Sequence, residues 1–289
     1  MYNQTMKINI VVIVGPTAIG KSDFAVNYAI RNNGEIISAD SRQVYKGMDI
    51  GTGKITKLEM KGIPHHLLDI AEPNEIFNVD KFKKHAEKAI DEISGKGKLP
   101  IICGGTGFYI DALINDIEYP SIPHNEILRE NLKDKNSDEL FLILEKMDNE
   151  YSNQLNNSEK NNKQRLIRSI EIAEQIGKIP KINKNTSKYN VKWLGLNMHF
   201  DKLKERIHNR LINRMNNGMI EEIIELNKEG LKFERMEELG LEYRYISRYI
   251  NNKISKNEMT KQLESEICKY AKRQLVWFKR NKDIEWINL

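Results

Sequence analysis

Short apolar runs alternate with amphipathic segments along the first hundred residues. The apolar runs cover residues 8–14 and 99–103, and residues 35–40 form a second buried-strand pattern that ends on an acid. Residues 23–33 and 79–95 place apolar side chains at helical spacing. A continuous run of apolar, largely β-branched residues is typical of a strand that is buried on both faces of a parallel sheet. The alternation with helices predicts an α/β fold of the P-loop NTPase-like kind, in which helices flank a parallel sheet core.

The pattern changes at about residue 118. Asn-, Lys- and Glu-rich segments follow, among them residues 137–147 and 163–177 with helical periodicity, before a strand pattern returns at residues 191–196. We interpret residues 118–188 as a helical insertion domain, placed within a core that is formed by residues 1–117 and 189–289.

Beyond residue 196 the pattern is helical. Helices are predicted over residues 201–218, 219–230 and 257–281, with a short segment around 239–243. The last helix carries an apolar stripe that favours packing in the core rather than cofactor binding. This stripe consists of Met259, Leu263, Ile267, Tyr270 and Trp277.

A phosphate-binding pattern joins the first predicted strand to the first predicted helix. Residues 15–22 read GPTAIGKS, which matches the spacing G-x-x-x-x-G-K-[ST]. The glycines let backbone N–H groups curl around an anion at a helix N-terminus, Lys21 adds a positive charge, and the Ser22 hydroxyl can reach a metal ion. The loop predicts a phosphate site without identifying the phosphate compound.

Polar groups follow the ends of the next two strands. Asp40 ends the second strand, and because parallel strands present their carboxyl ends at one edge of a sheet, Asp40 should lie beside the phosphate loop. Ser41 and Gln43 add hydroxyl and amide groups suited to a base edge. Residues 104–107, GGTG, end the following strand, where glycine allows close approach of a ligand and Thr106 supplies the only hydroxyl.

The composition limits the cellular compartment and the kinds of site that we expect. The 289 residues are 39% hydrophobic and 30% charged, and the mean hydropathy is −0.60. No apolar run approaches the roughly 20 residues of a membrane span, and no secretory signal is evident, so we expect a cytoplasmic protein without membrane contact. Two cysteines, Cys103 and Cys268, provide neither a disulfide framework nor a cysteine zinc site, and both are expected to pack.

Positive charge is concentrated in one segment. The whole chain carries a net charge of +5, whereas residues 160–192 hold nine Lys or Arg against two acidic residues. A basic segment on a near-neutral body favours a polyanionic partner, with nucleic acid the first candidate. A solvated, lysine-rich surface is the alternative.

Seven segments together resemble the tRNA dimethylallyltransferase (isopentenyltransferase) family. They occur in that family's order and span nearly the whole chain. The resemblance is to the bacterial type, since the zinc-finger tail of eukaryotic members is missing. The segments are GPTAxGKS at 15–22, DSxQVY at 40–45, DIGT at 49–52, PHHL at 64–67, GGTGxY at 104–109, QRxxR at 164–168 and AKRQ at 271–274.

The resemblance implies a prenyl transfer. A dimethylallyl group would pass from dimethylallyl diphosphate, with Mg²⁺ assistance, to the exocyclic amine of the adenosine 3′ of the anticodon in tRNAs that read codons beginning with U. The phosphate loop would hold the diphosphate leaving group, with Lys21 and a metal near Ser22 stabilising its developing charge. Asp40 would take the proton from the attacking amine, while Thr106 and Gln43 would position the adenine. We expect a monomer that binds the anticodon arm.

The implied site residues fall into four groups. The catalytic residues are Asp40, Thr106 and Lys21. The donor-binding residues are Gly15, Pro16, Thr17, Ala18, Ile19, Gly20, Lys21, Ser22 and Arg210. The tRNA-binding residues are Asp40, Ser41, Arg42, Gln43, Thr106, Arg129, Gln164, Arg165, Leu166, Ile167, Arg168, Lys272 and Arg273. The metal ligands are Ser22 and Asp40.

Four departures from the family pattern stand out. Ile19 replaces a common Ser, Asn162 a usual Asp, and Arg214 a usual Met, while residues 240–243 read GLEY instead of the commoner GYKE. None of them falls on a proposed catalytic residue.

Alternatives remain at the level of function and of individual residues. A P-loop kinase of a small metabolite and a non-catalytic RNA-binding ATPase would also contain the phosphate loop. Arg165 and Arg168, three residues apart on a predicted helix, would either meet the anticodon arm with Lys160 and Lys163 or pair with Glu171 to steady that helix.

Overall fold

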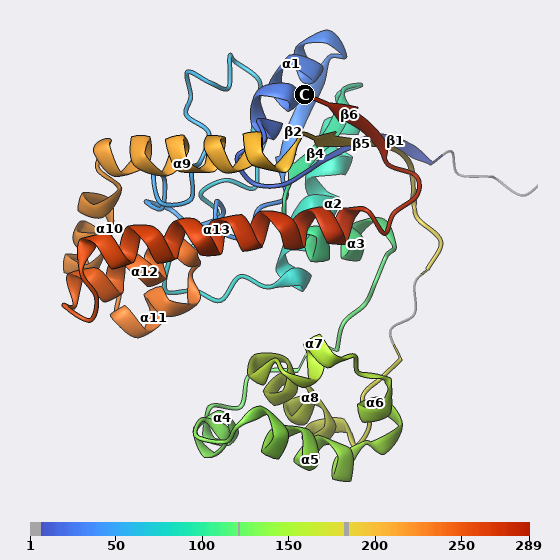
Figure 1. Cartoon of the computed structure of the whole chain (residues 1–289). Coiled ribbons are helices and arrows are strands. Elements are labelled where there is room, and N and C mark those ends of the chain that lie inside the picture. The colour runs from blue at the N-terminus through green and yellow to red at the C-terminus, as the bar shows by residue number, and fades with distance from the viewer. Residues whose placement is uncertain (1–6, 121, 182–184) are drawn as a thin grey trace, which may run out of the picture. The chain divides into compact units, whose positions relative to one another are not determined.

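A computed structural model describes residues 7–120, 122–181 and 185–289. The chain forms two compact units (Figure 1). The core unit contains the residues up to Asp116 together with Asn185–Leu289, and the insertion unit contains Ile117–Lys184. The predicted insertion, residues 118–188, extends past this second unit into the segment that leads to the strand at Tyr189.

The core unit contains a six-stranded parallel sheet in the order β3-β2-β4-β1-β5-β6, as expected for the predicted α/β class. Val12 pairs with Ile102 on one side and with Trp193 on the other, so the first strand is central. The strands are β1 Ile8–Val14, β2 Gly34–Ser38, β3 His65–His66, β4 Leu99–Gly104, β5 Tyr189–Asn197 and β6 Glu285–Asn288.

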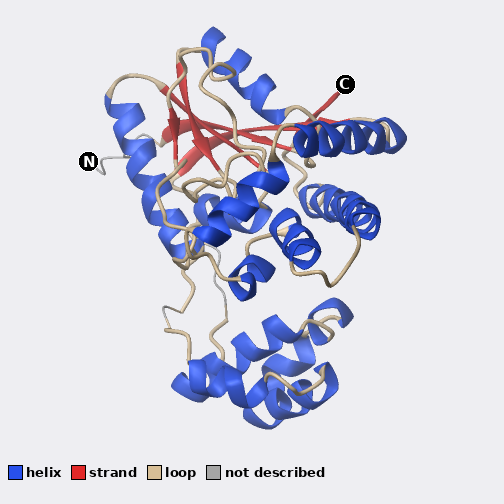
Figure 2. Cartoon of the chain, turned by 90° about the vertical axis from the view of Figure 1, so that its left-hand side faces the viewer, coloured by secondary structure: helices blue, strands red, loops and turns tan. Residues whose placement is uncertain are grey.

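Both faces of the central strands are covered by helices (Figure 2), which explains why residues 10–14 of β1 are all apolar and buried. Helix α1 (Lys21–Arg31) packs Ala25, Val26 and Ala29 against alternate residues of β1, including Val11 and Ile13. The intervening side chain of Val12 is also fully buried. The remaining helices of this half of the core are α2 Val79–Gly95 and α3 Gly107–Ile114.

The C-terminal part of the core unit is mostly helical. Its helices are α9 Phe200–Asn216, α10 Met219–Lys228, α11 Phe233–Glu238, α12 Leu241–Ile250 and α13 Lys256–Phe278. Helix α13 begins with a capping box formed by Ser255 and Glu258. The expectation that everything beyond residue 196 is helical is wrong at β6, which pairs with β5 at the edge of the sheet (Figure 1). Four residues are too few for a clear period-2 pattern.

In the described part of the insertion unit, residues 117–120 and 122–181, five helices cluster around a core of their own. Leucine and isoleucine side chains of α5 and α8 form this core, including Leu140, Leu144, Leu166 and Ile170. The helices are α4 Glu126–Leu132, α5 Ser137–Met147, α6 Asn149–Gln154, α7 Asn157–Lys160 and α8 Lys163–Ile176.

Asparagine or aspartate is the N-cap residue of each of the helices α4–α8. At each N-terminus a side-chain oxygen accepts a hydrogen bond from a backbone N–H of the first turn, which satisfies a donor that the helix itself leaves unpaired. The asparagine-rich composition of the segment therefore has a structural reason. The capping residues are Asn125, Asn136, Asp148, Asn156 and Asn162.

The two ends of the core unit that flank the insertion lie side by side. The backbone N–H of Asn185 donates to the carbonyl of Asn115 at 3.0 Å. The Asn185 side-chain amide donates to the carbonyl of Asp116 at 3.2 Å. These bonds fix the point where the chain leaves and re-enters the core.

Candidate active site

The phosphate loop curls between β1 and α1 as its spacing predicts. Ala18 and Gly20 adopt left-handed backbone conformations, with φ values of 63° and 100°. A Cβ atom on Gly15 would lie 2.9 Å from the carbonyl oxygen of Leu196, so the loop can approach β5 only with glycine at that position. Ile19, the departure from serine, is fully buried, and its side chain thus packs inward beneath the loop.

Lys21 is the first residue of α1 and lies within the loop. Its Nζ donates a hydrogen bond to the Pro16 carbonyl at 2.7 Å. Burial lowers the pKa of Lys21 to about 8, with a further lowering from the nearby charge of Arg210 that Cys103 and Asp40 oppose. An anion bound in the loop would favour the charged form and raise this pKa again.

Asp40 and Thr106 lie on neighbouring loops at the carboxyl edge of the sheet. Asp40 Oδ1 accepts hydrogen bonds from the backbone N–H groups of Arg42, at 2.8 Å, and Gln43, at 3.4 Å. The backbone N–H of Ser41 donates to Thr106 Oγ1 at 3.2 Å. Since β2 and β4 are adjacent strands, their ends bring these two predicted catalytic residues together.

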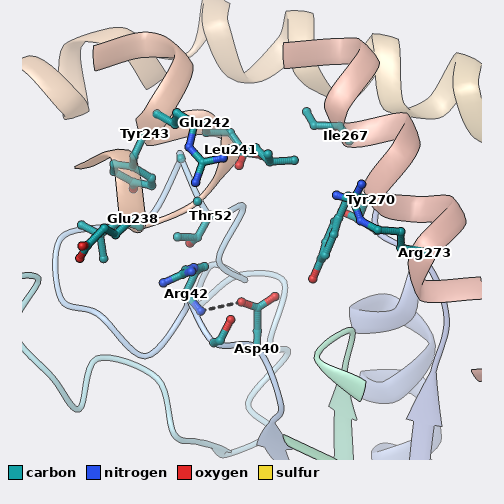
Figure 3. Close-up of a pocket in the computed structure, with 16 residues that line it drawn as sticks. Asp40, Arg42, Thr52, Glu238, Leu241, Glu242, Tyr243, Ile267, Tyr270 and Arg273 are labelled. Atoms are coloured by element: carbon teal, nitrogen blue, oxygen red, sulfur yellow. Dashed lines mark hydrogen bonds between the residues drawn. The ribbon is translucent and has the colours of Figure 1, made fainter. Parts of the chain in front are cut away.

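A pocket of about 290 Å³ opens above this edge (Figure 3). Thr17 of the phosphate loop and Asp40 both line it, so the structure brings the predicted donor side and the predicted base to one cavity. Tyr270 extends into the pocket from α13 (Figure 3). Other lining residues are Ser41, Arg42, Gly51, Thr52, Leu241, Glu242, Ile267 and Arg273.

Helical spacing assigns Tyr270 to the apolar stripe of the last helix. Met259, Leu263 and Ile267 of that stripe are buried as expected, whereas Tyr270 is only partly buried, and Ile267 and Tyr270 both border the pocket. Burial raises the pKa of Tyr270 well above its ordinary value, and the charge of Asp40 acts in the same direction. The phenol therefore remains a hydrogen-bond donor at neutral pH. Helical spacing alone does not separate a core side from a pocket side.

The loop at residues 49–53 is held by two charged side chains. Glu222 of α10 accepts hydrogen bonds from the backbone N–H groups of residues 49, 50 and 51 at 3.0, 2.6 and 2.8 Å. Arg214 of α9 donates to the carbonyls of Ile50, at 2.6 Å, and Gly51. The Tyr243 hydroxyl adds a 2.8 Å bond to Glu222. The Glu222 carboxylate thus satisfies N–H groups of this loop backbone, and the Arg214 guanidinium satisfies its carbonyl groups.

Gly53 connects two predicted site residues. Its carbonyl accepts hydrogen bonds from Arg210 Nη2 at 3.2 Å and from Gln43 Nε2 at 3.3 Å. A Cβ atom at position 53 would lie 2.0 Å from Arg210 Nη2, so glycine is required for this approach. The arginine expected on the diphosphate and the glutamine expected on the adenine therefore share one acceptor.

Other atoms of the protein occupy the space left by the missing Cβ atoms of the glycines at the end of β4. Added Cβ atoms would lie 2.2 Å from the Ala39 carbonyl oxygen at Gly104 and 2.1 Å from Gln274 Nε2 at Gly105. At Gly107 the distance to Trp277 would be 2.3 Å. The GGTG segment consequently allows α13 to approach the sheet edge, a role that the sequence pattern did not indicate.

A magnesium ion at this site would have to be bound chiefly through its substrate. Among the residues that the structure describes, no group of three or more His, Cys, Asp or Glu side chains could hold a metal ion. Ser22 at the start of α1 offers a hydroxyl and Asp40 a carboxylate. Mg²⁺ commonly takes one or two protein oxygens and completes its shell with phosphate oxygens and water.

The predicted RNA contacts on the basic helix α8 differ in their exposure to solvent. Gln164 and Arg165 are exposed, and Arg165 Nη1 lies 3.4 Å from a carboxylate oxygen of Glu159. Leu166 and Ile167 are 1% and 6% exposed. This burial argues against contacts between these two side chains and tRNA and assigns them to the packing of the insertion unit.

Glu171 engages the other two arginines of this unit. Its buried carboxylate accepts from Arg129 Nε at 2.5 Å, from Arg129 Nη2 at 2.9 Å and from Arg168 Nη1 at 3.1 Å. Arg168 Nη2 also donates to the Ile122 carbonyl at 2.8 Å. The pairing of Arg168 with Glu171 is the structural alternative that the sequence left open, whereas Arg165 does not take part in it.

The remaining predicted RNA contacts lie on α13. Lys272 and Arg273 are exposed. Lys272 Nζ lies 4.7 Å from the centre of the Phe200 ring. The guanidinium carbon of Arg273 lies 5.9 Å from the centre of the Tyr270 ring. Arg273 also lines the pocket, so a cation stands at its border.

Known proteins resemble this chain over nearly its whole length. A sequence model described as IPP transferase matches residues 43–281. The tRNA dimethylallyltransferase 2 of Treponema denticola is 44% identical over 291 residues, covering 97% of this chain and 96% of the relative. The tRNA dimethylallyltransferase of Anoxybacillus flavithermus is 40% identical over 285 residues, covering 97% and 90%.

Solved structures show the same fold. The crystal structure of the tRNA isopentenylpyrophosphate transferase from Bacillus halodurans superposes with a TM-score of 0.73 at 36% identity, covering 98% of this chain and 90% of that chain. A eukaryotic dimethylallyltransferase described as acting on tRNA gives a TM-score of 0.79 at 26% identity, covering 97% and 74%.

Proposed function

The chain belongs to the IPP transferase family, and on this basis we propose that it is a tRNA dimethylallyltransferase whose donor is dimethylallyl diphosphate. The acceptor would be the exocyclic amine of the adenosine 3′ of the anticodon, in tRNAs that read codons beginning with U. The observation that carries the proposal is the shared pocket of Thr17 and Asp40. It sets a phosphate loop beside a carboxylate that can serve as a base.

In the proposed reaction the amine nitrogen attacks the first carbon of the dimethylallyl group. A carbon–nitrogen bond forms, the carbon–oxygen bond to the diphosphate breaks, and diphosphate leaves with its negative charge. Asp40 takes the amine proton, and two backbone N–H bonds to Oδ1 hold its carboxylate in place. An exocyclic amine is a poor nucleophile, so fixed positioning is expected to supply much of the rate enhancement.

Leaving-group charge would be stabilised by the phosphate loop. Its backbone N–H groups, the Lys21 ammonium and the Arg210 guanidinium would face the diphosphate as the negative charge grows. Arg210 is suited to this task because a guanidinium stays charged even when it is largely buried. Ser22 and Asp40 would hold Mg²⁺, which supplies further charge neutralisation on the diphosphate when bound.

The acceptor base would enter the pocket out of its stack, as bases do in enzymes that modify them. Thr106 and Gln43 would position it, with Ser41 and Arg42 beside it. Exposed Arg165, Lys272 and Arg273 would contact the RNA backbone of the anticodon arm.

We propose that the protein acts as a monomer in the cytoplasm. None of the helices in the described ranges combines the length and the hydrophobicity that a membrane span requires.

A transfer assay tests the proposal directly. The purified protein is incubated with dimethylallyl diphosphate, Mg²⁺ and unmodified tRNA, and the nucleosides of the digested tRNA are analysed by mass spectrometry. We expect a dimethylallyl adduct on one adenosine, located by sequencing next to the anticodon. Absence of the adduct, with an active family member as positive control, would exclude the proposed activity.

The same preparation distinguishes the kinase alternative. ATP with pools of small metabolites should yield no phosphorylated product above the background of the Lys21→Ala variant. Phosphoryl transfer that depends on Lys21, without prenylated tRNA, would favour a metabolite kinase instead.

A further inference from the structure

A buried amide joins the phosphate loop to the end of β4. Gln274 of α13 is 6% exposed, its Oε1 accepts from the Thr17 backbone N–H at 2.8 Å, and its Nε2 donates to the Gly105 carbonyl at 3.0 Å. We propose that Gln274 is a positioning residue for the prenyl transfer. It fixes the donor-binding loop against the loop that carries Thr106. This inference rests on the proposed function.

The two bonds determine the orientation of the amide. The phosphate loop presents an N–H donor to one end, and Gly105, which follows β4, presents a carbonyl acceptor to the other. A flipped amide would set donor against donor and oxygen against oxygen. A single side chain thereby uses both kinds of hydrogen-bonding group to span two loops that are 88 residues apart in the chain, from Thr17 to Gly105.

The surroundings of the amide are matched to it. A Cβ atom on Gly105 would lie 2.1 Å from Gln274 Nε2, so any larger residue at position 105 would displace the side chain. Three residues further along α13, the Trp277 indole N–H donates to the carboxylate of Asp111 in α3 at 3.0 Å. These contacts hold one side of α13 to the segment that follows β4.

The bridge connects the two halves of the proposed reaction. Thr17 belongs to the loop that would hold the diphosphate, and Gly105 precedes Thr106, whose hydroxyl accepts from the Ser41 N–H beside Asp40. Because the Thr17 N–H already has a partner, the diphosphate would be held by other N–H groups of the loop. A displacement of about 1 Å between reacting groups can lower a rate about 100-fold. The rate of prenyl transfer should therefore depend on the distance between the phosphate loop and the loop that carries Thr106.

The test begins with Gln274→Met, which keeps side-chain length but removes both hydrogen bonds. We expect kcat to fall about 10- to 100-fold and the Kd for inorganic pyrophosphate, measured by calorimetry, to rise several-fold. The KM for tRNA should stay within about twofold of the wild-type value. Gln262→Met, at an exposed position on the same helix, is the matched control and should change none of these quantities.

Gly105→Ala disturbs the same contact from the other side without altering the glutamine. It should reproduce the loss in kcat, while Gly95→Ala, whose Cβ would meet no heavy atom within 4 Å, should not. If both changes act through one contact, the double variant Gly105→Ala/Gln274→Met will be little worse than either single variant. Fully additive losses would overturn the proposal, and Gly105→Ala decides the matter if Gln274→Met does not fold.

The outcomes separate this inference from the function on which it rests. Wild-type protein that fails to prenylate tRNA would refute the function, whereas the pyrophosphate measurement still reports on the bridge. Active wild-type protein with unchanged kcat and pyrophosphate affinity in Gln274→Met, and only a lower melting temperature, would make Gln274 merely structural and refute the inference.

Discussion

Arg214 Nη1 lies 3.0 Å from Glu242 Oε1, and both residues are departures from the family pattern. Where Met and Lys are usual, this chain has an arginine and a glutamate that form an ion pair with limited exposure, 13% and 20% for the two side chains. Arg214 also holds the loop at residues 49–53. The two departures therefore contact each other directly in the structure.

This pairing predicts non-additive effects. Arg214→Met should lower the free energy of unfolding by about 2–3 kcal/mol, because it leaves the Glu242 carboxylate and two loop carbonyls without their charged donor. The double variant Arg214→Met/Glu242→Lys should recover part of that loss, with a coupling of about 1 kcal/mol. Denaturant titration of the four proteins measures the coupling. A double variant whose loss equals the sum of the single losses would show that the pair is not coupled.

Asp40→Asn tests the proposed base. The variant keeps the shape of the side chain and an oxygen for the N–H groups of Arg42 and Gln43, but it cannot accept the amine proton. We expect kcat to fall about 10²- to 10⁴-fold, with the Kd for tRNA nearly unchanged. Asp91→Asn, on the exposed side of α2, serves as control. A kcat close to wild type would remove Asp40 from the proposed role.

Lys21 predicts a pH limit on donor binding. Its pKa of about 8 in the free protein means that the ammonium is charged below that pH and is lost above it. Since the diphosphate favours the charged form, kcat/KM for dimethylallyl diphosphate should decline above about pH 8. Lys21→Arg should abolish this decline, as arginine stays charged. Parallel profiles in the two proteins would assign the decline to another group, because the ligand's own titration affects both equally.

Arg165 and Arg168 should now respond differently to alanine substitution. Arg165 is 57% exposed in its pair with Glu159, so Arg165→Ala should raise the KM for tRNA and make the salt dependence shallower by about 0.7–0.9 log units per lost contact. Arg168→Ala should instead lower thermal stability through the loss of its bond to Glu171. Equal effects of both variants on tRNA binding, without loss of stability, would contradict this division.

Glu171 predicts an acid-sensitive contribution to stability. Burial raises the pKa of Glu171, but hydrogen bonds from Arg129 and Arg168 outweigh it and lower the value to about 2, from 4.5 for an ordinary glutamate. The ionised carboxylate therefore stabilises the fold above about pH 4.5, and this contribution is lost as the pH falls toward 2. Glu171→Gln should be less stable than wild type at pH 7, and the difference should shrink with acidification. A difference that does not change between pH 7 and pH 3 would contradict the assignment.

Local patterns predicted those parts of the fold that are decided within a few residues. The phosphate loop follows from glycine spacing, and the meeting of Asp40 with that loop follows from the geometry of parallel strands. The continuous apolar runs of β1 and β4 identify buried strands because both faces of the sheet are covered. In each case the physical cause lies in the segment itself or in a general rule of sheet topology.

Contacts between distant segments were not accessible in this way. Gln274 is one polar residue on a long helix, and its partners lie 257 and 169 residues away. The burial of Leu166 and Ile167 beside exposed Arg165 depends on which side of α8 meets α5, which the basic composition of the segment does not reveal. The roles of Gly105 and Gly107 were likewise not predictable from local sequence, because the side chains that lie against their missing Cβ positions come from α13.

The hydrogen-bonded ends at Asn115, Asp116 and Asn185 make the insertion a removable module. Because the chain leaves and re-enters the core at neighbouring residues, a short glycine-rich linker could replace residues 117–184 without pulling on β5. Such a shortened protein would keep the phosphate loop and Gln274 together. It should retain pyrophosphate binding while losing the contact that we propose between Arg165 and tRNA, so that the chemistry on the small substrate and the binding of RNA are encoded in separable parts of one chain.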